Sequence, residues 1–428
     1  MTRYTLIKDV RLCAGDGKMS RYDILLSGSE GAYKIEKITD PSVIRADRAK
    51  IVNAAGNIAL PAFVDICPVF CEPGFVYRED ISSLTHAASA GGFCALLGLP
   101  LTDPPCDTPE TVYKINDIIK DKAVCAMRPV GKITAISESE ILTNIPDMVS
   151  AGVTSFTEGI NPVMSLYLKR KVMNECRKSG AVYISFPRIN ELIRRGKVNE
   201  GRVSRLLKVD GIPPSAEAVA IASDVILSAD TGCRLHIMNV STAAGAEIIR
   251  SAKKKSIPVT ASTAPEYISM TEDDVLYHGK SAFIYPPLRT ESDRRAVCLG
   301  LIDGTIDCIS CNHRPLRANE KDPDGSFENT EFGAIGLQTA FSAVLEQLCY
   351  KQKKPLSLII DLLSRNPAKL FGIDTEIREG NMANFCIVDP SEEYVVSKNM
   401  ILSRSGSTPF EGMTMRGTVK YNYFSYLP

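Results

Sequence analysis

Short apolar segments alternate with amphipathic segments along the middle of the chain, and this alternation constrains the fold more than any other feature. Helical patterns separate most of the apolar stretches, for example residues 215–230 and 242–256. Strands that alternate with helices indicate a parallel sheet, and repeated βα units over roughly 310 residues fit an α/β fold of the TIM-type (β/α)8 barrel. The predicted barrel strands are residues 59–66, 92–100, 131–137, 153–158, 182–187, 234–240, 257–263 and 305–310.

The two ends of the chain show a different pattern, in which short strands are joined by turns. The predicted terminal strands are residues 4–13, 21–28, 33–38, 50–60, 382–390, 392–396 and 417–427. Two β-rich ends around a long α/β middle predict one small β-sandwich domain built from both ends. We therefore assign residues 1–58 and 376–428 to the sandwich and residues 59–375 to the barrel.

Composition narrows the class of partner. Lys+Arg and Asp+Glu both number 50 in the 428 residues, which argues against a nucleic-acid or membrane-surface partner. No apolar stretch approaches the ~20 residues of a membrane span, and the first residues lack a signal-peptide pattern. Several of the 13 cysteines lie in apolar runs, which is typical of a reducing compartment. We expect a cytoplasmic protein with no nucleic-acid or membrane partner.

Four segments carry a resemblance to a known family. Residues 61–110 follow the pattern P-G-x-x-D-x-H-x-H-x-R-E-P-G, and residues 234–253 follow H-x-x-H-V-S-T. Residues 285–316 follow N-P-P-L-R…T-D-H-A-P-H, and residues 403–419 follow S-x-S-x-x-T-P-F-x-G. On these motifs the chain resembles the cyclic amidohydrolases, and among them the dihydroorotases, over essentially its whole length. The resemblance implies an amidohydrolase barrel whose zinc ions activate water to convert dihydroorotate to N-carbamoyl-aspartate.

The positions at which this resemblance implies metal ligands carry other residues. The two histidines of H-x-H are replaced by Cys67 and Val69, and a third histidine position falls near Phe186. The histidine of H-V-S-T is replaced by Asn239, and Glu158 stands alone as a surviving bridging carboxylate. We expect no zinc at these positions. Glu158 is either an unpaired remnant or is neutralised by Arg188.

The catalytic and substrate-binding positions are also replaced. The proton-shuttling aspartate is Asn312, which cannot act as a base at ordinary pH. The substrate-binding positions implied by the family are occupied by Cys71, Leu101, Tyr285 and Leu316. We expect no catalytic or substrate-binding residue here, and we expect the bulky replacements to fill the former metal cavity.

Two alternatives stay open. Zinc accepts thiolates, so Cys67, Cys71, Glu158 and His313 could form an unusual metal site of an active cyclic-amide hydrolase. Side chains alternate between the two faces of a strand, which predicts that Asp65, Cys67 and Val69 lie on one face and that Cys67 occupies a true ligand position. The other alternative is a ligand-binding module with a changed ligand, which requires an open, polar barrel mouth.

The remaining histidines have ordinary explanations. We predict that His236, inside a strand, is a buried core residue, and that His86 is a surface or packing residue. By resemblance, inactive dihydroorotase homologues act as scaffolds, and some assemble with aspartate transcarbamoylase. We therefore expect a non-catalytic structural or regulatory subunit of de novo pyrimidine (UMP) biosynthesis that partners aspartate transcarbamoylase. The expected assembly is a homodimer or a larger hetero-oligomer.

Overall fold

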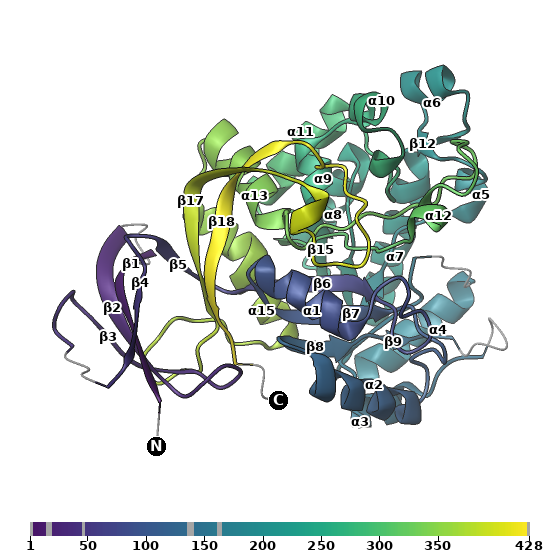
Figure 1. Ribbon diagram of the computed structural model, residues 1–428. Helices are drawn as coiled ribbons and strands as arrows, with labels where there is room; N and C mark the ends of the chain where they lie inside the picture. The colour runs from purple at the N-terminus through teal and green to yellow at the C-terminus, as the bar shows by residue number, and fades with distance from the viewer. Residues whose placement is uncertain (1–2, 14–18, 45–47, 135–140, 161–164, 426–428) are drawn as a thin grey trace.

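The computed structural model describes residues 3–13, 19–44, 48–134, 141–160 and 165–425, apart from the side chain of Cys67. Figure 1 shows a large barrel with helices around it and a smaller β-sheet body beside it, built from both chain ends. The predicted fold class, an amidohydrolase (β/α)8 barrel with a small discontinuous β-sandwich, is confirmed.

The barrel wall is made of parallel strands. They form a sheet ordered β6-β7-β8 and a sheet ordered β16-β15-β14-β11-β10-β9. The backbone N–H of Val69 donates to His313 O over 2.8 Å, and this bond joins β6 to the segment after β16. The strands are β6 (Phe63–Phe70), β7 (Phe93–Pro100), β8 (Ala126–Pro129), β9 (Gly131–Lys132), β10 (Ser155–Thr157), β11 (Val182–Ser185), β14 (Arg234–Ile237), β15 (Val259–Thr263) and β16 (Cys308–Ile309).

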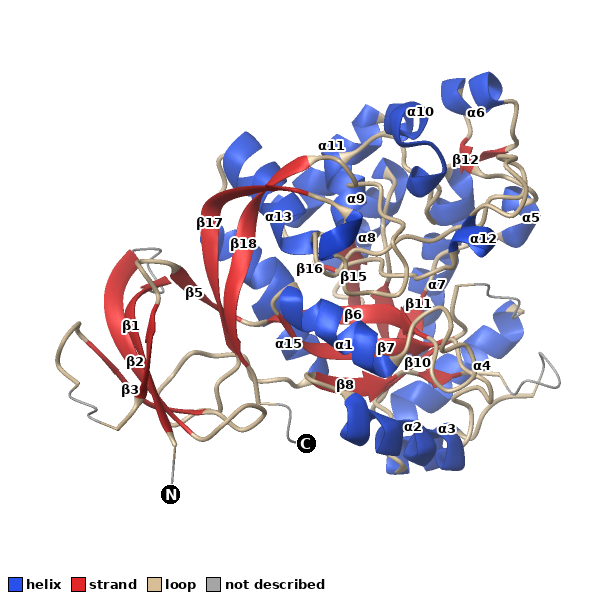
Figure 2. Cartoon of the chain, viewed as in Figure 1, coloured by secondary structure: helices blue, strands red, loops and turns tan. Residues whose placement is uncertain are grey.

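Helices follow the strands and cover the barrel, as Figure 2 shows. Their first turns are held by side chains that accept backbone N–H bonds, for example Asp80 from Ser83 N over 2.7 Å and Thr242 from Gly245 N over 3.0 Å. The longer helices are α1 (Ile81–Ala90), α2 (Pro109–Lys122), α4 (Leu166–Lys178), α7 (Ser215–Thr231), α8 (Ala243–Lys254) and α11 (Glu291–Ile302).

The chain also contains shorter elements, all between residues 145 and 400. The short α-helices are α3 (Ile145–Ser150), α5 (Asn190–Ile193), α6 (Arg202–Leu207), α9 (Pro265–Ser269), α10 (Val275–His278), α12 (Ala318–Lys321), α13 (Ala340–Val344), α14 (Leu356–Ile360) and α15 (Asn366–Phe371). The 3-10 and π-helical turns are η1 (Glu272–Asp274), η2 (Gly279–Ala282), η3 (Leu345–Lys351), η4 (Asp361–Arg365) and η5 (Lys398–Met400). A two-stranded parallel pair, β12 (Val198–Asn199) with β13 (Gly211–Ile212), lies outside the barrel wall.

The smaller body is a seven-stranded sheet ordered β18-β17-β5-β1-β2-β3, with β4 also paired to β1. The register of β1 shifts between Ile7 and Val10, and Asp9 has φ 55° there. This irregularity lets the first half of β1 pair with β4 and its second half with β5. The strands are β1 (Tyr4–Cys13), β2 (Met19–Ser27), β3 (Lys34–Thr39), β4 (Lys50–Asn53), β5 (Ile58–Pro61), β17 (Phe385–Val395) and β18 (Thr414–Tyr423).

Three details differ from the sequence prediction. Residues 58–61 pair in the small sheet, so the first barrel strand begins only at Phe63. The third barrel strand includes β8, where Arg128 and Pro129 interrupt the apolar pattern; the predicted segment 131–137 is described only to residue 134. Residues 385–395 form one strand instead of two. The domain boundaries at residues 58/59 and 375/376 stay predictions.

No helix within the described residues is both long and apolar enough to cross a lipid bilayer.

Candidate functional site at the barrel mouth

The carboxyl ends of the barrel strands surround a cavity of about 20 Å³. A cavity of this size holds roughly one water molecule. Six residues singled out from the sequence line it: Val69, Phe186, Asn239, Tyr285, Asn312 and His313. Three of the five bulky side chains predicted to converge on the mouth, Val69, Phe186 and Tyr285, line this cavity, whereas Leu101 and Leu316 do not.

Other predicted residues do not line this cavity. Cys71 and Leu316 are buried, and Leu101 is half-buried against the core. Glu158 accepts a 2.5 Å bond from Thr134 Oγ1, and burial raises the pKa of its carboxyl. Cys67 belongs to β6, but its side chain lies outside the described residues.

Aromatic rings fill much of the mouth. The rings of Phe186 and Tyr285 stack with centroids 5.8 Å apart, and Phe332 meets Tyr285 edge-on at 5.6 Å. The guanidinium of Arg188 lies over the Tyr285 ring, 4.8 Å from its centroid. Arg188 also donates from Nε to Asn190 Oδ1 over 2.6 Å, whereas the ion pairs of the described residues include none between Arg188 and Glu158. The sequence did not single out Phe332, because it lies in a loop without a motif.

Asn239 and Asn312, which the resemblance places at a histidine and an aspartate position, bond to each other. Asn239 Nδ2 donates to Asn312 Oδ1 over 2.9 Å, and Asn312 Nδ2 donates to the Tyr267 hydroxyl over 3.3 Å. The Tyr267 hydroxyl donates in turn to Pro286 O over 2.7 Å. Both asparagines have positive φ, 52° and 49°. Among non-glycine residues, Asn, Asp and His are the most enriched at positive φ. Asparagine therefore suits this backbone as well as histidine or aspartate does.

Asn239 Oδ1 takes no part in this hydrogen-bond chain. Within the part of the chain that the structure describes, Asn239 Oδ1 and Arg314 Nε are buried and bond to no protein group. Burial lowers the pKa of Arg314 to about 10, so it is still charged at neutral pH. Arg314 stands at the alanine of the family's T-D-H-A-P-H, and sequence reasoning passed over it although it adjoins His313.

Two buried carboxyl groups lie below the mouth. Asp65 Oδ1 accepts from the N–H groups of Cys311 and Ile66 over 2.8 and 3.0 Å, and burial raises the pKa of Asp65 to about 6. Glu266 is fully buried, and burial raises its pKa to about 8. At neutral pH Glu266 is therefore largely an uncharged acid. No motif pointed to Glu266 from the sequence.

The strand that carries Asp65 is not regular. Its register against β7 shifts between Ile66 and Val69. This shift, a bulge or a similar irregularity, interrupts strict alternation between Asp65 and Val69. The side chain of Cys67 lies outside the described residues, so the prediction that Asp65, Cys67 and Val69 share one face stays a prediction.

His313 is held by its surroundings. Its Nδ1 accepts from Gly336 N over 3.4 Å, and its Nε2 lies 3.5 Å from Glu79 Oε2. Glu79 accepts bonds from the Ser403 hydroxyl and from Arg404 N, in the closing S-x-S-x-x-T-P-F segment. His313 thus links the last barrel strand to the C-terminal part of the chain.

The described side chains at the mouth do not fit a zinc ion. Val69 and Phe186 offer no donor atom, and Cys71 does not line the cavity. In residues 3–13, 19–44, 48–134, 141–160 and 165–425, no three His, Cys, Asp or Glu side chains are grouped so that they could hold a metal ion. The alternative zinc site would use Cys67, Cys71, Glu158 and His313. The absence of such a group covers Cys71, Glu158 and His313, and the side chain of Cys67 lies outside the described residues.

His236 and His86 behave as predicted. His236 is buried, and its ring nitrogens lie 2.9 Å from Thr260 Oγ1 and 3.2 Å from Ser262 Oγ. Burial lowers its pKa to about 3, so it stays neutral in the core. His86 is on the exposed side of α1 and bonds to Ser82 O over 2.8 Å.

Comparison with known proteins supports a family assignment. The family model described as "Dihydro-orotase-like" matches residues 56–244. A dihydroorotase of Thermoanaerobacter sp. (strain X514) is 34% identical over 97% of this chain and 94% of its own length. The dihydroorotase of Aquifex aeolicus is 35% identical over 94% of this chain and 92% of its own length.

Solved structures share the fold. An L-hydantoinase (dihydropyrimidinase) from Arthrobacter aurescens superposes with a TM-score of 0.86 at 22% identity, covering 100% of this chain and 98% of its own. The dihydropyrimidinase of Brevibacillus agri NCHU1002 gives a TM-score of 0.83 at 19% identity, with coverages of 100% and 94%. At these identities the structures establish the fold, while the full-length relatives at about one-third identity establish the kinship: this chain belongs to the dihydroorotase family.

Proposed function

We propose that this chain is a non-catalytic member of the dihydroorotase family that serves pyrimidine biosynthesis as a structural or regulatory subunit. The observation that carries the proposal is the filled mouth. Phe186 and Tyr285, which the resemblance places at a ligand and a substrate position, stack on each other, Phe332 packs against Tyr285, and the remaining cavity has room for about one water.

The chemistry of the remaining polar groups supports the same proposal. Hydrolysis of a cyclic amide needs an activated water and a group that accepts its proton. Asn312 is an amide already bonded to Asn239 and Tyr267, and Cys71 is a protonated thiol. Neither can take a proton at neutral pH. We therefore propose that the chain holds no catalytic zinc.

The proposed partner is aspartate transcarbamoylase, and the ground for it is the resemblance to inactive dihydroorotase homologues that assemble with that enzyme. The barrel has retained a packed core, since Phe156, Ile237 and Ile309 are all fully buried. A barrel that keeps a packed core but has a filled mouth can still offer its outer surface to a partner protein, although it has no room for a substrate.

The decisive experiment is light scattering of the chain, alone and mixed with aspartate transcarbamoylase of the same organism, with transcarbamoylase activity measured on the same fractions. We expect a stoichiometric complex. Separate elution with unchanged activity would refute the partnership. The same preparation is assayed for zinc and for dihydroorotate hydrolysis in both directions. Stoichiometric zinc with activity that is lost in Cys67→Ala would instead establish the cysteine-containing metal site.

A further inference from the structure

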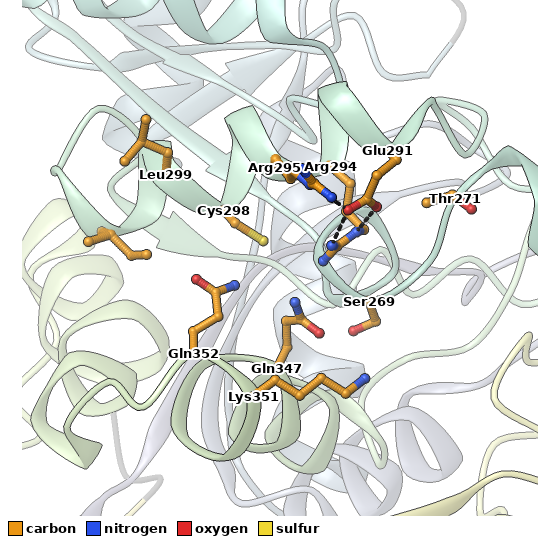
Figure 3. Close-up of a pocket in the computed structure, with 11 residues that line it drawn as sticks. Ser269, Thr271, Glu291, Arg294, Arg295, Cys298, Leu299, Gln347, Lys351 and Gln352 are labelled. Carbon is orange, nitrogen blue, oxygen red and sulfur yellow. Dashed lines mark hydrogen bonds and ion pairs between the residues drawn. The ribbon is translucent and has the colours of Figure 1, made fainter.

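A second hollow lies on the outer side of the barrel, away from the mouth. This groove has a volume of about 610 Å³ and lies between α11 and η3, with residues 269–271 closing one side (Figure 3). Its lining residues and those of the mouth cavity do not overlap. Its size falls within the roughly 300–1,000 Å³ of small-molecule sites in proteins.

One end of the groove is positively charged. Arg294 and Arg295 both bond to Glu291, with Nε–Oε distances of 2.6 and 2.7 Å, and Lys351 approaches from the opposite wall. These bonds lower the pKa of Glu291 to about 2, so its carboxylate is ionised at neutral pH. The groove lining thus carries three cations, Arg294, Arg295 and Lys351, and one carboxylate, Glu291, and the surplus positive charge suits an anion.

The middle of the groove carries amide groups. Gln347 is only 5% exposed, yet its side chain lines the groove, as do those of Gln352 and Cys298 (Figure 3). Each amide carries two donors and an acceptor oxygen that a ligand can use. Ser269 Oγ is buried at the same groove and bonds to no group within the described residues.

The far end is apolar. Leu299 and Ile302 line it, and Leu299 is 54% exposed, a large fraction for a leucine beside a polar groove. From one end to the other the groove thus offers cations, then hydrogen-bonding amides, then aliphatic side chains (Figure 3).

We propose that this groove binds a small organic phosphate of nucleoside-monophosphate size. The phosphate pairs with Lys351 and Arg295, whose guanidinium has donors beyond the Nε that meets Glu291. The polar ring of the ligand bonds to Gln347, Gln352 and Ser269, and a carbon face of the ligand covers Leu299. The site goes beyond the proposed function, because it needs neither the mouth nor a partner protein.

The test is isothermal titration of the full-length chain at constant ionic strength. The probes are uridine and adenosine 5′-monophosphates, the corresponding nucleosides, and inorganic phosphate. We expect saturable binding of a nucleoside monophosphate with a Kd of about 1 mM or tighter. The nucleosides and inorganic phosphate should each bind at least about tenfold more weakly, because each lacks one half of the recognised chemistry.

Three variants assign the binding to the groove. Lys351→Gln and Arg295→Gln should each raise the Kd of the nucleotide at least about tenfold, the worth of one charge-assisted contact. Gln347→Leu should weaken the nucleotide and leave inorganic phosphate unchanged. The control is Lys369→Gln, an exposed lysine on α15 outside the groove, which should leave the Kd unchanged.

Absence of saturable binding for both nucleotides would overturn the proposal, as would nucleotide binding that both charge variants retain. Equal affinity for inorganic phosphate and nucleotide would also overturn it, because the amides would then contribute nothing. Lys351 is exposed, so Lys351→Gln should fold normally and keeps the test valid if Arg295→Gln does not fold. None of these results alters the light-scattering measurement with aspartate transcarbamoylase, so the two proposals fail separately.

Discussion

Truncating the aromatic ring at the centre of the mouth, Tyr285→Ala, tests whether the mouth is packed as a core. Tyr285 is 5% exposed and contacts Phe186, Phe332 and Arg188. If the mouth were still an open site, this side chain would contribute little to stability. If the mouth is a packed core, Tyr285→Ala should lower the free energy of unfolding as much as the loss of any buried aromatic side chain does.

The expected magnitude follows from these contacts. Burying a large side chain contributes roughly 1.5–3 kcal/mol, and each aromatic pair adds roughly 0.5–1.5 kcal/mol. The 3.5 Å contact from the Tyr285 hydroxyl to Pro187 O is long and adds little. We expect Tyr285→Ala to lower the free energy of unfolding by about 3–5 kcal/mol, the range found for aromatic-to-alanine changes in cores.

The assay is urea denaturation followed by circular dichroism, with Tyr277→Ala as the matched control. Tyr277, in α10, is 83% exposed, and its loss should cost less than about 0.5 kcal/mol. A cost below about 1 kcal/mol for Tyr285→Ala, similar to that of the control, would show that the mouth is not a packed core. It would also remove the main support for the non-catalytic reading.

Three further predictions concern the interior. In the folded chain the pKa of Glu266 is raised from 4.5 to about 8, so between these values the unfolded chain loses a proton that the folded chain keeps, and folding is penalised increasingly as pH rises. Glu266→Gln should therefore stabilise the protein by an amount that grows from pH 4.5 to 8 in urea denaturation; a pH-independent difference would contradict this. A high-resolution crystal structure should show one water bonded to Arg314 Nε and Asn239 Oδ1, and electron density that contacts neither atom would refute it. Cys71→Ala should leave aspartate transcarbamoylase binding unchanged in light scattering, because the buried thiol is a packing residue; loss of the complex with the fold intact would contradict that role.

The small sheet and the barrel illustrate how far local pattern reaches. The apolar periodicity of residues 4–13 and 92–100 marks strands that form within a residue of where they were expected. Periodicity does not mark β8 as a strand, because Arg128 and Pro129 interrupt its apolar pattern, and it does not show the register shift of β6 between Ile66 and Val69. Both β6 and β8 pair with β7, which is about 30 residues away from each of them along the chain. A local pattern therefore cannot record either pairing.

At the mouth, the sequence by itself determined which chemical groups are present. It fixed an amide at Asn312, a thiol at Cys71 and aromatic rings at Phe186 and Tyr285, and a side chain's chemical type does not depend on its neighbours. Only the tertiary structure decided how these groups combine. The stacking of Tyr285 on Phe186, the bond from Asn239 to Asn312 and the raised pKa of Glu266 all arise from burial among residues distant in sequence. Burial changes the energy of a charge or a ring through its surroundings, and no local pattern in the chain records those surroundings.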